Sequence, residues 1–474
     1  MQKNKIIRQA LPLVPAMLLA GCAGLSQSPT HLEPAFWKGE PPDALVSRNG
    51  RKIDSAAAWM EIRRPELLHL FSTTVYGKPL PVPEGIEFRV LERDDNALGG
   101  KAIRIQGDIL CKGIDQPNPF RLLLYLPKNA GGPVPVFLGL NFQGNHSTTF
   151  DPAVLIPEWN PKPRPRGNRA DRYDLDLLLD AGYGLATIHT ADIEPDRPDS
   201  WKTGVRRAYL ADGVQKKDDP GTISTWAWGL SRGLDALLTI PEVDPDRVIV
   251  WGHSRLGKTS LWAAATDPRF AAAVSNDSGC GGASLTRHIV RDGKSETLRK
   301  IIEVFPHWFA LNLSDYIDRE EALPVDQHEL LALVAPRPVY VASAESDVWA
   351  DPEGEFLAAR EASKVYRLFG RAGIPEEAPM PKLHEPVGEG IGYHIRAGEH
   401  SVHSFDWAAF VDFMNANLLP TNFRPKTNRT SPACRFATLG SFRSALRPKN
   451  HPAFRRPGSG ALAVAVAYVQ YLCC

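Results

Sequence analysis

Cysteine is scarce in this sequence, with six among 474 residues. The six form no Cys-x-x-Cys pair and have no histidine at ligand spacing, which argues against a structural zinc site and excludes a small disulfide scaffold. Long apolar runs are lacking as well. No stretch offers the roughly 20 apolar residues that a membrane-spanning helix needs, and the best candidate, Ala461–Cys474, is too short.

Acidic residues are missing from both ends of the chain. Residues 1–22 contain three Lys or Arg and residues 421–474 contain nine, and neither segment contains Asp or Glu. The segment between them therefore has a net charge of −11, which makes a poor nucleic-acid surface. The whole sequence is 43% hydrophobic and 9% aromatic, so collagen-like and disordered classes are excluded.

The N-terminal segment has the pattern of an export signal. A basic start precedes the short apolar run Leu11–Ala20, and Leu-Ala-Gly-Cys22 resembles the bacterial lipoprotein cleavage box. We interpret 1–22 as a lipoprotein-type signal peptide with Cys22 as the lipidated residue; plain cleavage after a small residue is the alternative. The polar residues 23–44 would form a tether. We therefore expect an exported, non-integral protein, periplasmic or attached to the outer membrane.

The body of the chain predicts an α/β fold, because apolar strands alternate with amphipathic helices. Helix Ala56–Tyr76 and three strands in an antiparallel start are followed by βαβ units. We expect one domain over residues 45–419, a three-layer sandwich with a mostly parallel central sheet. The expected strands are Ile86–Leu91, Lys101–Leu110, Phe120–Leu126, Val134–Leu140, Gly184–His189, Arg247–Trp251, Ala271–Ser275 and Val339–Ser343, and the expected later helices are Leu175–Ala181, Ser224–Ile240, Leu256–Thr266, Pro352–Leu368 and Trp407–Leu418.

Two segments stand outside this alternation. Pro152–Asn168 is rich in Pro and Arg and is interpreted as a surface loop insertion. Residues 420–474 continue no core pattern and are interpreted as a basic, disordered tail.

A strand-turn-helix pattern around Ser254 indicates catalysis. The apolar strand ending in Trp251 meets Gly-His-Ser254-Arg-Leu-Gly-Lys and runs directly into a helix. A serine on such a turn is presented above the sheet edge as a nucleophile. The pattern departs from Gly-x-Ser-x-Gly because Leu256 holds the place of the second glycine, and Gly257 follows. The alternative is a serine that merely caps the helix.

A serine nucleophile needs a base and an acid that orients the base. His394, His400 and His403 all precede the last helix, and we choose His400 because it follows a glycine-containing turn; the other two would make surface or capping hydrogen bonds. Asp347, after strand Val339–Ser343, and Asp277, after strand Ala271–Ser275, are both candidates for the acid. We favour Asp347 and leave Asp277 open.

Two cations follow the serine. Arg255 is adjacent to Ser254, and Lys258 lies one helical turn further on. A guanidinium beside the nucleophile would add a charge-assisted donor to an oxyanion hole, and Lys258 indicates a substrate with hydroxyls or a carboxyl-derived group. Solvated charges are the alternative, which is disfavoured because cations oppose the dipole at a helix start.

The segment Gly252–Lys258 resembles the Gly-Cys-Ser-Arg-x-Gly-Lys signature of the glucuronoyl esterases, carbohydrate esterase family 15, with His253 in place of the cysteine as in the bacterial branch. The similarity covers about Trp59 to Leu418. Corroborating segments are Leu138–His146, Asn276–Gly282, Phe305–Phe309, Ser343–Pro352 and Gly398–His400.

The resemblance implies an α/β-hydrolase fold and a cofactor-free, metal-free esterase. The substrate would be the ester between (4-O-methyl-)glucuronic acid of xylan and lignin alcohols. It implies Ser254 as nucleophile, His400 as base, Arg255 as oxyanion stabiliser and Lys258 as a donor to sugar hydroxyls. Glu296 and Trp349 fall where the family contacts the uronate ring, and the triad acid would be Asp347 or Asp277. We expect a monomer.

Two other functions compete with this interpretation. An acetyl-xylan esterase or general carboxylesterase on the same fold would hydrolyse acetyl esters without regard to the uronate. A non-catalytic, lipid-anchored carbohydrate-binding protein would lack a member of the triad, and the sequence has a candidate for each member.

Overall fold

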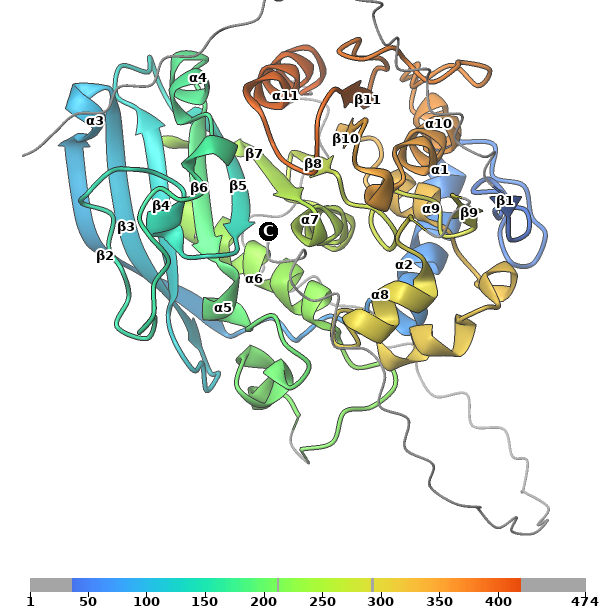
Figure 1. Cartoon of the computed structure of the whole chain (residues 1–474), viewed down its shortest axis with the longest axis horizontal. Helices are drawn as coiled ribbons and strands as arrows, with labels where there is room; N and C mark the ends of the chain where they lie inside the picture. The colour runs from blue at the N-terminus through green and yellow to red at the C-terminus, as the bar shows by residue number, and fades with distance from the viewer. Residues whose placement is uncertain (1–35, 211–212, 291–293, 419–474) are drawn as a thin grey trace, which may run out of the picture. The chain divides into compact units, whose positions relative to one another are not determined.

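The computed structural model describes residues 36–210, 213–290 and 294–418. A nine-stranded sheet runs through them in the order β11-β10-β8-β7-β5-β6-β4-β3-β2 (Figure 1). The pairs β2–β3, β3–β4 and β4–β6 are antiparallel, and the remaining pairs are parallel. The strands are β2 (Gly85–Asn96), β3 (Ala102–Lys112), β4 (Phe120–Pro127), β5 (Val134–Asn141), β6 (Gly184–His189), β7 (Val243–His253), β8 (Ala272–Asn276), β10 (Val339–Ala344) and β11 (Ile391–Arg396).

Helices cover both faces of the sheet. The first, predicted over Ala56–Tyr76, contains α1 (Ala56–Ala58), a π-helical segment (Trp59–Arg63) and α2 (Arg64–Thr74). The others are α3 (Ala97–Gly100), α4 (Leu175–Asp180), α5 (Thr190–Ile193), α6 (Thr222–Leu237), α7 (Arg255–Thr266), α8 (Leu298–Val304), α9 (Gln327–Ala332), α10 (Pro352–Leu368) and α11 (Ser404–Asn417).

The core has two main layers, one on each side of the sheet. Neighbouring residues of a central strand point into different layers: Val136 and Val250 pack towards α6, α7 and α10, whereas Phe137 and Ile249 pack towards α4 and α11. This double burial explains the unbroken apolar runs of β5 and β7. The α/β three-layer sandwich with a mostly parallel sheet is confirmed (Figure 1).

One strand of the nine-stranded sheet, β11, was not predicted from the sequence. β11 contains His394, which was expected to make a surface or capping bond but is fully buried between Tyr340 (2.9 Å) and Asp406 (2.8 Å). That expectation is wrong because β11 pairs with β10 and packs under α11, which buries its glycine, histidine and arginine together with its apolar residues.

The described residues of the N-terminal segment contact the body of the protein. β1 (Phe36–Trp37) pairs with β9 (His288–Ile289), and Lys38 forms an ion pair with Glu320 at 2.9 Å. These contacts lie within the segment assigned above to a tether. The predicted signal peptide, Cys22 and the tail from 420 onwards lie outside the described residues.

The insertion at 152–168 forms neither helix nor strand. Its Trp159 donates to Asp192 at 2.8 Å and packs against the Arg121 guanidinium, and Leu155 N donates to Gln106 Oε1 of β3 at 2.8 Å, so the insertion is attached to the body of the protein at more than one point. Across residues 36–210, 213–290 and 294–418, no helix combines the length and apolar character that crossing a bilayer requires.

Candidate active site

Ser254 occupies a sharp turn between β7 and α7. Its backbone has φ 59° and ψ −130°, a conformation that non-glycine residues rarely adopt and that is typical of a nucleophile elbow. Its amide donates to the Asn276 carbonyl at 2.8 Å. A Cβ on Gly252 would collide with the Leu256 carbonyl, and one on Gly257 would lie 2.9 Å from the Ser278 side chain. The crowded positions are therefore 252 and 257, which explains how Leu256 can stand where the common motif has glycine.

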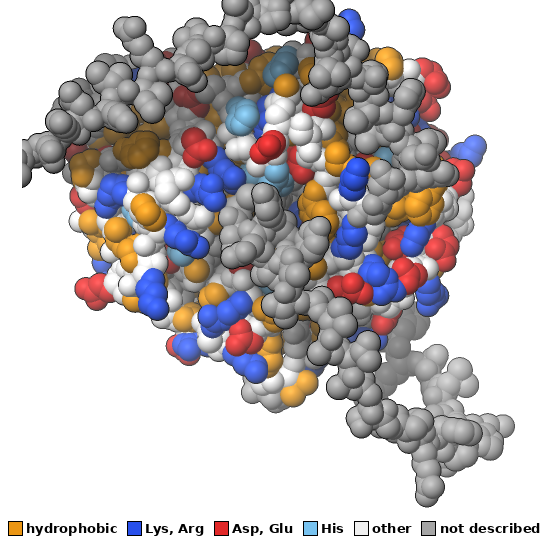
Figure 2. Space-filling view, in the orientation of Figure 1, with side chains coloured by type: hydrophobic (Ala, Val, Ile, Leu, Met, Phe, Trp, Pro, Cys, Tyr) orange, Lys and Arg blue, Asp and Glu red, His pale blue; other side chains and the backbone are white. Residues whose placement is uncertain are grey.

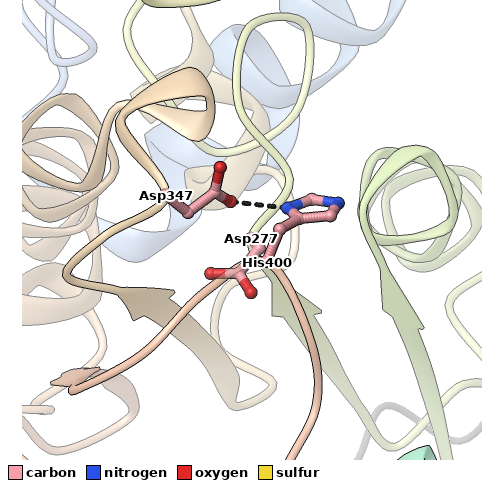
Figure 3. A group of neighbouring side chains, drawn as sticks. All are labelled: Asp277, Asp347 and His400. Atoms are coloured by element: carbon pink, nitrogen blue, oxygen red, sulfur yellow. Dashed lines mark hydrogen bonds and ion pairs between the residues drawn. The ribbon is translucent and has the colours of Figure 1, made fainter. Parts of the chain in front are cut away.

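His400 and Asp347 meet beside this elbow. His400 Nδ1 lies 2.5 Å from Asp347 Oδ2, and the carboxylate is buried while the imidazole is half-buried (Figure 3). The two loops that carry them are joined by their backbones, because Glu345 N donates to Arg396 O (2.8 Å) and Ser346 N to Gly398 O (3.0 Å). The structure thus brings together the preferred base and the preferred acid.

Asp277 lies below the same imidazole. It has φ 47°, and its ligand atoms are within 4.8 Å of those of Asp347 and His400 (Figure 3). Burial, and secondarily the Asp347 charge, raise the pKa of Asp277 well above its usual range, and Oδ1 has no hydrogen-bond partner among the described residues. These three side chains are also a set that could hold a metal ion; two of them, His400 and Asp347, are joined by a direct hydrogen bond, and Asp277 Oδ2 lies 3.6 Å from Arg396.

His253, next to Ser254 in the sequence, packs against His400. The rings of His253 and His400 have centroids 4.4 Å apart. Burial, followed by the nearby His400, holds the pKa of His253 well below its usual value, so this ring is neutral. Its Nδ1 lies 2.6 Å from the Asn276 side-chain amide, so the His253 ring is fixed against that of His400.

Arg255 is fixed by a carboxylate and by aromatic rings. Its guanidinium forms an ion pair with Asp196 at 2.5 Å and lies 4.6 Å from the centre of the Trp308 ring and 5.2 Å from that of Phe305. Arg255 Nε is buried without a hydrogen-bond partner in the described part of the chain. Of the five N–H groups of this guanidinium, only one on Nη1 has a recorded hydrogen bond among the described residues, to Asp196, so other donors remain for a ligand.

Asp196 connects Arg255 to the segment around His307. It accepts hydrogen bonds from His307 Nε2 and Trp308 Nε1, both at 2.8 Å. Burial by itself would raise the pKa of Asp196, but these two bonds and the Arg255 charge outweigh it and lower the pKa to about 2. The ion pair with Arg255 is consequently intact at all but strongly acidic pH.

This lowered pKa predicts how the stability of an Asp196→Asn variant depends on pH. The carboxylate stabilises the fold fully above its ordinary pKa near 4, and this contribution is lost as the pH falls through about 2. We expect the wild type to have the higher Tm at pH 6, with a difference that shrinks below about pH 4. Thermal unfolding of both proteins between pH 6 and 2.5 tests this, and a difference that does not change with pH would contradict it.

Lys258 and Glu296 form a buried ion pair one helical turn beyond the elbow. Lys258 Nζ lies 2.7 Å from Glu296 Oε2 and also donates to the carbonyls of Ser278 and Cys280 (2.8 Å to the latter). Glu296 N donates to Trp349 O at 2.8 Å, so the backbones of Glu296 and Trp349 are adjacent, and the Trp349 side chain is half-buried. The three residues expected to contact a uronate ring are thus neighbours.

Ionic side chains extend to the surface here. Figure 2 shows histidine, acidic and basic side chains gathered around the upper middle of the face viewed, rather than a continuous apolar patch. Because lipid esterases bind apolar acyl chains, this polar surround fits a carbohydrate substrate better.

Comparisons with known proteins decide the family. A sequence profile described as "Glucuronyl esterase, fungi" matches residues 178–370. "Carbohydrate esterase MZ0003", from an unknown prokaryotic organism, is 43% identical over 395 residues, 80% of this chain and 89% of that protein. A solved structure, "Glucuronoyl Esterase from Solibacter usitatus", has a TM-score of 0.75 at 42% identity, covering 80% of this chain and 97% of the other. This chain belongs to the glucuronoyl esterases.

A fungal glucuronoyl esterase extends the similarity. The "4-O-methyl-glucuronoyl methylesterase" of Schizophyllum commune is 34% identical over 340 residues, which cover 71% of this chain and 74% of that protein. The expected α/β-hydrolase fold is that of the family. Membership of the glucuronoyl esterase family agrees with the resemblance of the segment Gly252–Lys258 to the signature of that family.

Sequence reasoning missed several residues of this glucuronoyl esterase site. Asp196, His307 and Trp308 hold Arg255 from segments 50 to 60 residues away; His307 and Trp308 lie in the segment Phe305–Phe309 that carried part of the resemblance, but no role was predicted for them. One signal was available for Asp196: it follows shortly after the predicted strand Gly184–His189, and side chains that follow parallel strands gather at the catalytic edge of such sheets.

Proposed function

We propose that this chain hydrolyses the ester between the C6 carboxyl of (4-O-methyl-)glucuronic acid on glucuronoxylan and a lignin alcohol. The observation that carries the proposal is the buried Lys258–Glu296 pair next to the Ser254 elbow. Burying such a pair costs desolvation energy that an esterase for simple acyl groups would have no use for. Lys258 Nζ is held by Glu296 and by the carbonyls of Ser278 and Cys280, and its charge keeps the Glu296 carboxylate in place as a charged acceptor that suits a hydroxyl of a sugar ring. The names of the relatives support the same substrate class.

The proposed reaction uses three side chains, those of Ser254, His400 and Asp347. His400 Nε2 takes the Ser254 hydroxyl proton, and the Ser254 oxygen attacks the C6 carbonyl. The tetrahedral intermediate collapses, the bond from C6 to the alcohol oxygen breaks, and the alcohol leaves with the proton from His400. A water molecule, deprotonated by His400, then attacks the glucuronoyl-Ser254 ester; the bond from C6 to the Ser254 oxygen breaks, His400 returns the proton to that oxygen, and the uronate is released. Asp347 accepts from Nδ1 throughout and stabilises the imidazolium.

Arg255 is the proposed oxyanion stabiliser. Its guanidinium is immobilised by Asp196 and the Trp308 ring before substrate arrives, so no reorganisation is needed when charge develops on the carbonyl oxygen. The unpartnered Nε donor and the Arg255 backbone N–H are the donors we assign to this charge.

The experiment that tests the substrate assignment compares three compounds. Benzyl glucuronate, methyl glucuronate and 4-nitrophenyl acetate are offered to the full chain. Hydrolysis of the uronate esters with the larger kcat/KM supports the proposal. Turnover of the acetate alone would favour the acetyl-xylan or general carboxylesterase function, and no turnover of any compound would favour a binding role.

The leader pattern supports export, and we propose attachment through a lipidated Cys22, with the enzyme acting as a monomer in the periplasm or at the outer membrane. Replacing Cys22 with serine is expected to move the protein from the membrane fraction to the soluble fraction of a producing cell. Recovery of wild type and variant in the same fraction would contradict the anchor.

A further inference from the structure

Arg396 is the last residue of β11 and is completely buried. Its guanidinium has five N–H donors in a rigid plane. Nε donates to Asp406 Oδ2 at 2.8 Å, one terminal nitrogen donates to Ala397 O at 3.0 Å, and the other donates to Glu399 O at 3.1 Å and to Ser401 O. One side chain thus binds three carbonyls of the segment that follows it.

Those carbonyls surround the proposed base. Glu399 and Ser401 are the two neighbours of His400, so the guanidinium holds the backbone on both sides of it. Asp406, at the start of α11, accepts from Arg396 and also from His403 N at 2.7 Å. The loop from 397 to 403 is consequently fixed at its beginning, its middle and its end by one buried ion pair.

The Arg396 guanidinium is also the nearest recorded positive charge to Asp277, the second carboxyl group near His400. Arg396 lies 3.6 Å from Asp277 Oδ2, and both side chains are buried. Arg396 therefore connects the His400 loop with the residue below the imidazole, although it is not placed to touch a substrate bound at Ser254.

We propose that Arg396 is a positioning residue for the esterase reaction: it sets the place and orientation of His400 relative to Asp347 and Ser254. The inference rests on the proposed role of His400 as base. A lysine has three N–H groups on a single nitrogen and cannot serve the four acceptors of Arg396, which are Asp406 and the carbonyls of residues 397, 399 and 401 spread around the guanidinium plane. The position consequently requires the fork of an arginine rather than only a positive charge.

The test uses Arg396→Lys and Arg396→Met, with Arg287→Met as a matched control. Arg287 is another buried arginine that pairs with a carboxylate, Asp326 at 3.0 Å, and donates to backbone carbonyls, Val325 O at 3.0 Å and Leu323 O at 2.6 Å, away from the His400 loop. Each variant is assayed on benzyl glucuronate. The proton of the His400–Asp347 hydrogen bond is followed by proton NMR through its downfield signal, called the low-field signal below. Unfolding temperature is measured for all of them.

We expect kcat to fall about 100-fold in Arg396→Met and about tenfold or more in Arg396→Lys, because misplacing a catalytic group by about 1 Å costs this much. KM should stay close to the wild-type value, and the low-field proton signal should disappear. Arg287→Met should lose stability but keep kcat and the signal. If Arg396→Met does not fold, Arg396→Lys decides alone.

A kcat in the Arg396 variants equal to that of Arg287→Met, with the proton signal retained, would overturn the inference. His400→Ala separates this failure from a failure of the proposed site. If His400→Ala is inactive while the Arg396 variants are normal, only the positioning role is wrong. If His400→Ala remains active, the base itself has been assigned wrongly.

Discussion

Replacing Ser254 with alanine is expected to lower kcat on benzyl glucuronate by about 10⁶-fold, because the nucleophile and its base act as one unit and the loss of either removes nearly all of their contribution. Binding should survive, since the substitution removes one oxygen at a position where the backbone, rather than the side chain, forms the recorded hydrogen bond. The measurement is kcat at saturating substrate, with KM or inhibitor affinity determined alongside.

Ser363→Ala is a suitable control for this variant. Ser363 is a buried serine in α10 whose hydroxyl donates to Ala359 O and accepts from Ile374 N, so its loss should affect stability and leave kcat unchanged. Retention of more than about 1% of wild-type kcat by a well-folded Ser254→Ala protein would contradict the assignment, because nucleophile removal in serine hydrolases leaves far less.

Replacing Asp347 with asparagine is expected to lower kcat by about 10⁴-fold. An amide in this position can donate to His400 Nδ1, which favours the wrong tautomer and removes the charge that stabilises the imidazolium. The overall structure should be kept because asparagine has nearly the same shape. The measurement is kcat/KM between pH 6 and 9.

Asp277→Asn is the matched comparison, and its loss should be about tenfold or smaller, since no hydrogen bond is recorded between Asp277 and His400 and burial raises the pKa of that carboxyl. The opposite order, with Asp277→Asn the more damaging change, would assign the triad acid to Asp277 and show that the His400–Asp347 bond has another role.

The nucleophile elbow could be predicted from sequence because it is a local property of the chain. A buried strand, a tight turn that needs glycine and a helix follow one another between Arg247 and Thr266, and the structure has them as β7, Ser254 and α7. Asp347 could be reached because it follows a predicted strand, and side chains after parallel strands gather at one edge of the sheet. His400 was reached from the glycine-containing turn that it follows shortly before the last helix.

β11 could not be predicted because tertiary contacts, rather than its own pattern, determine its burial. Gly392 interrupts the apolar run, yet a Cβ there would lie 2.6 Å from Phe413 and 2.7 Å from Tyr340, so glycine is what allows the strand to pack under α11. His394 and Arg396 are buried because Asp406, ten or more residues later, satisfies both. Partners at such a separation leave no periodicity to detect.

The central claim is that the Lys258–Glu296 pair beside Ser254 selects a uronate ester. Its most direct test is the ratio of kcat/KM for benzyl glucuronate to that for 4-nitrophenyl acetate, measured for wild type and for the double variant Lys258→Met with Glu296→Gln. The double change avoids leaving one buried charge without its partner.

We predict that the wild type prefers the uronate ester and that the double variant loses about 10- to 100-fold on it, as expected when charge-assisted hydrogen bonds to sugar hydroxyls are removed, while acetate hydrolysis changes little. Equal losses on both substrates would show that the pair only supports the fold, and a wild type that prefers the acetate would contradict the claim.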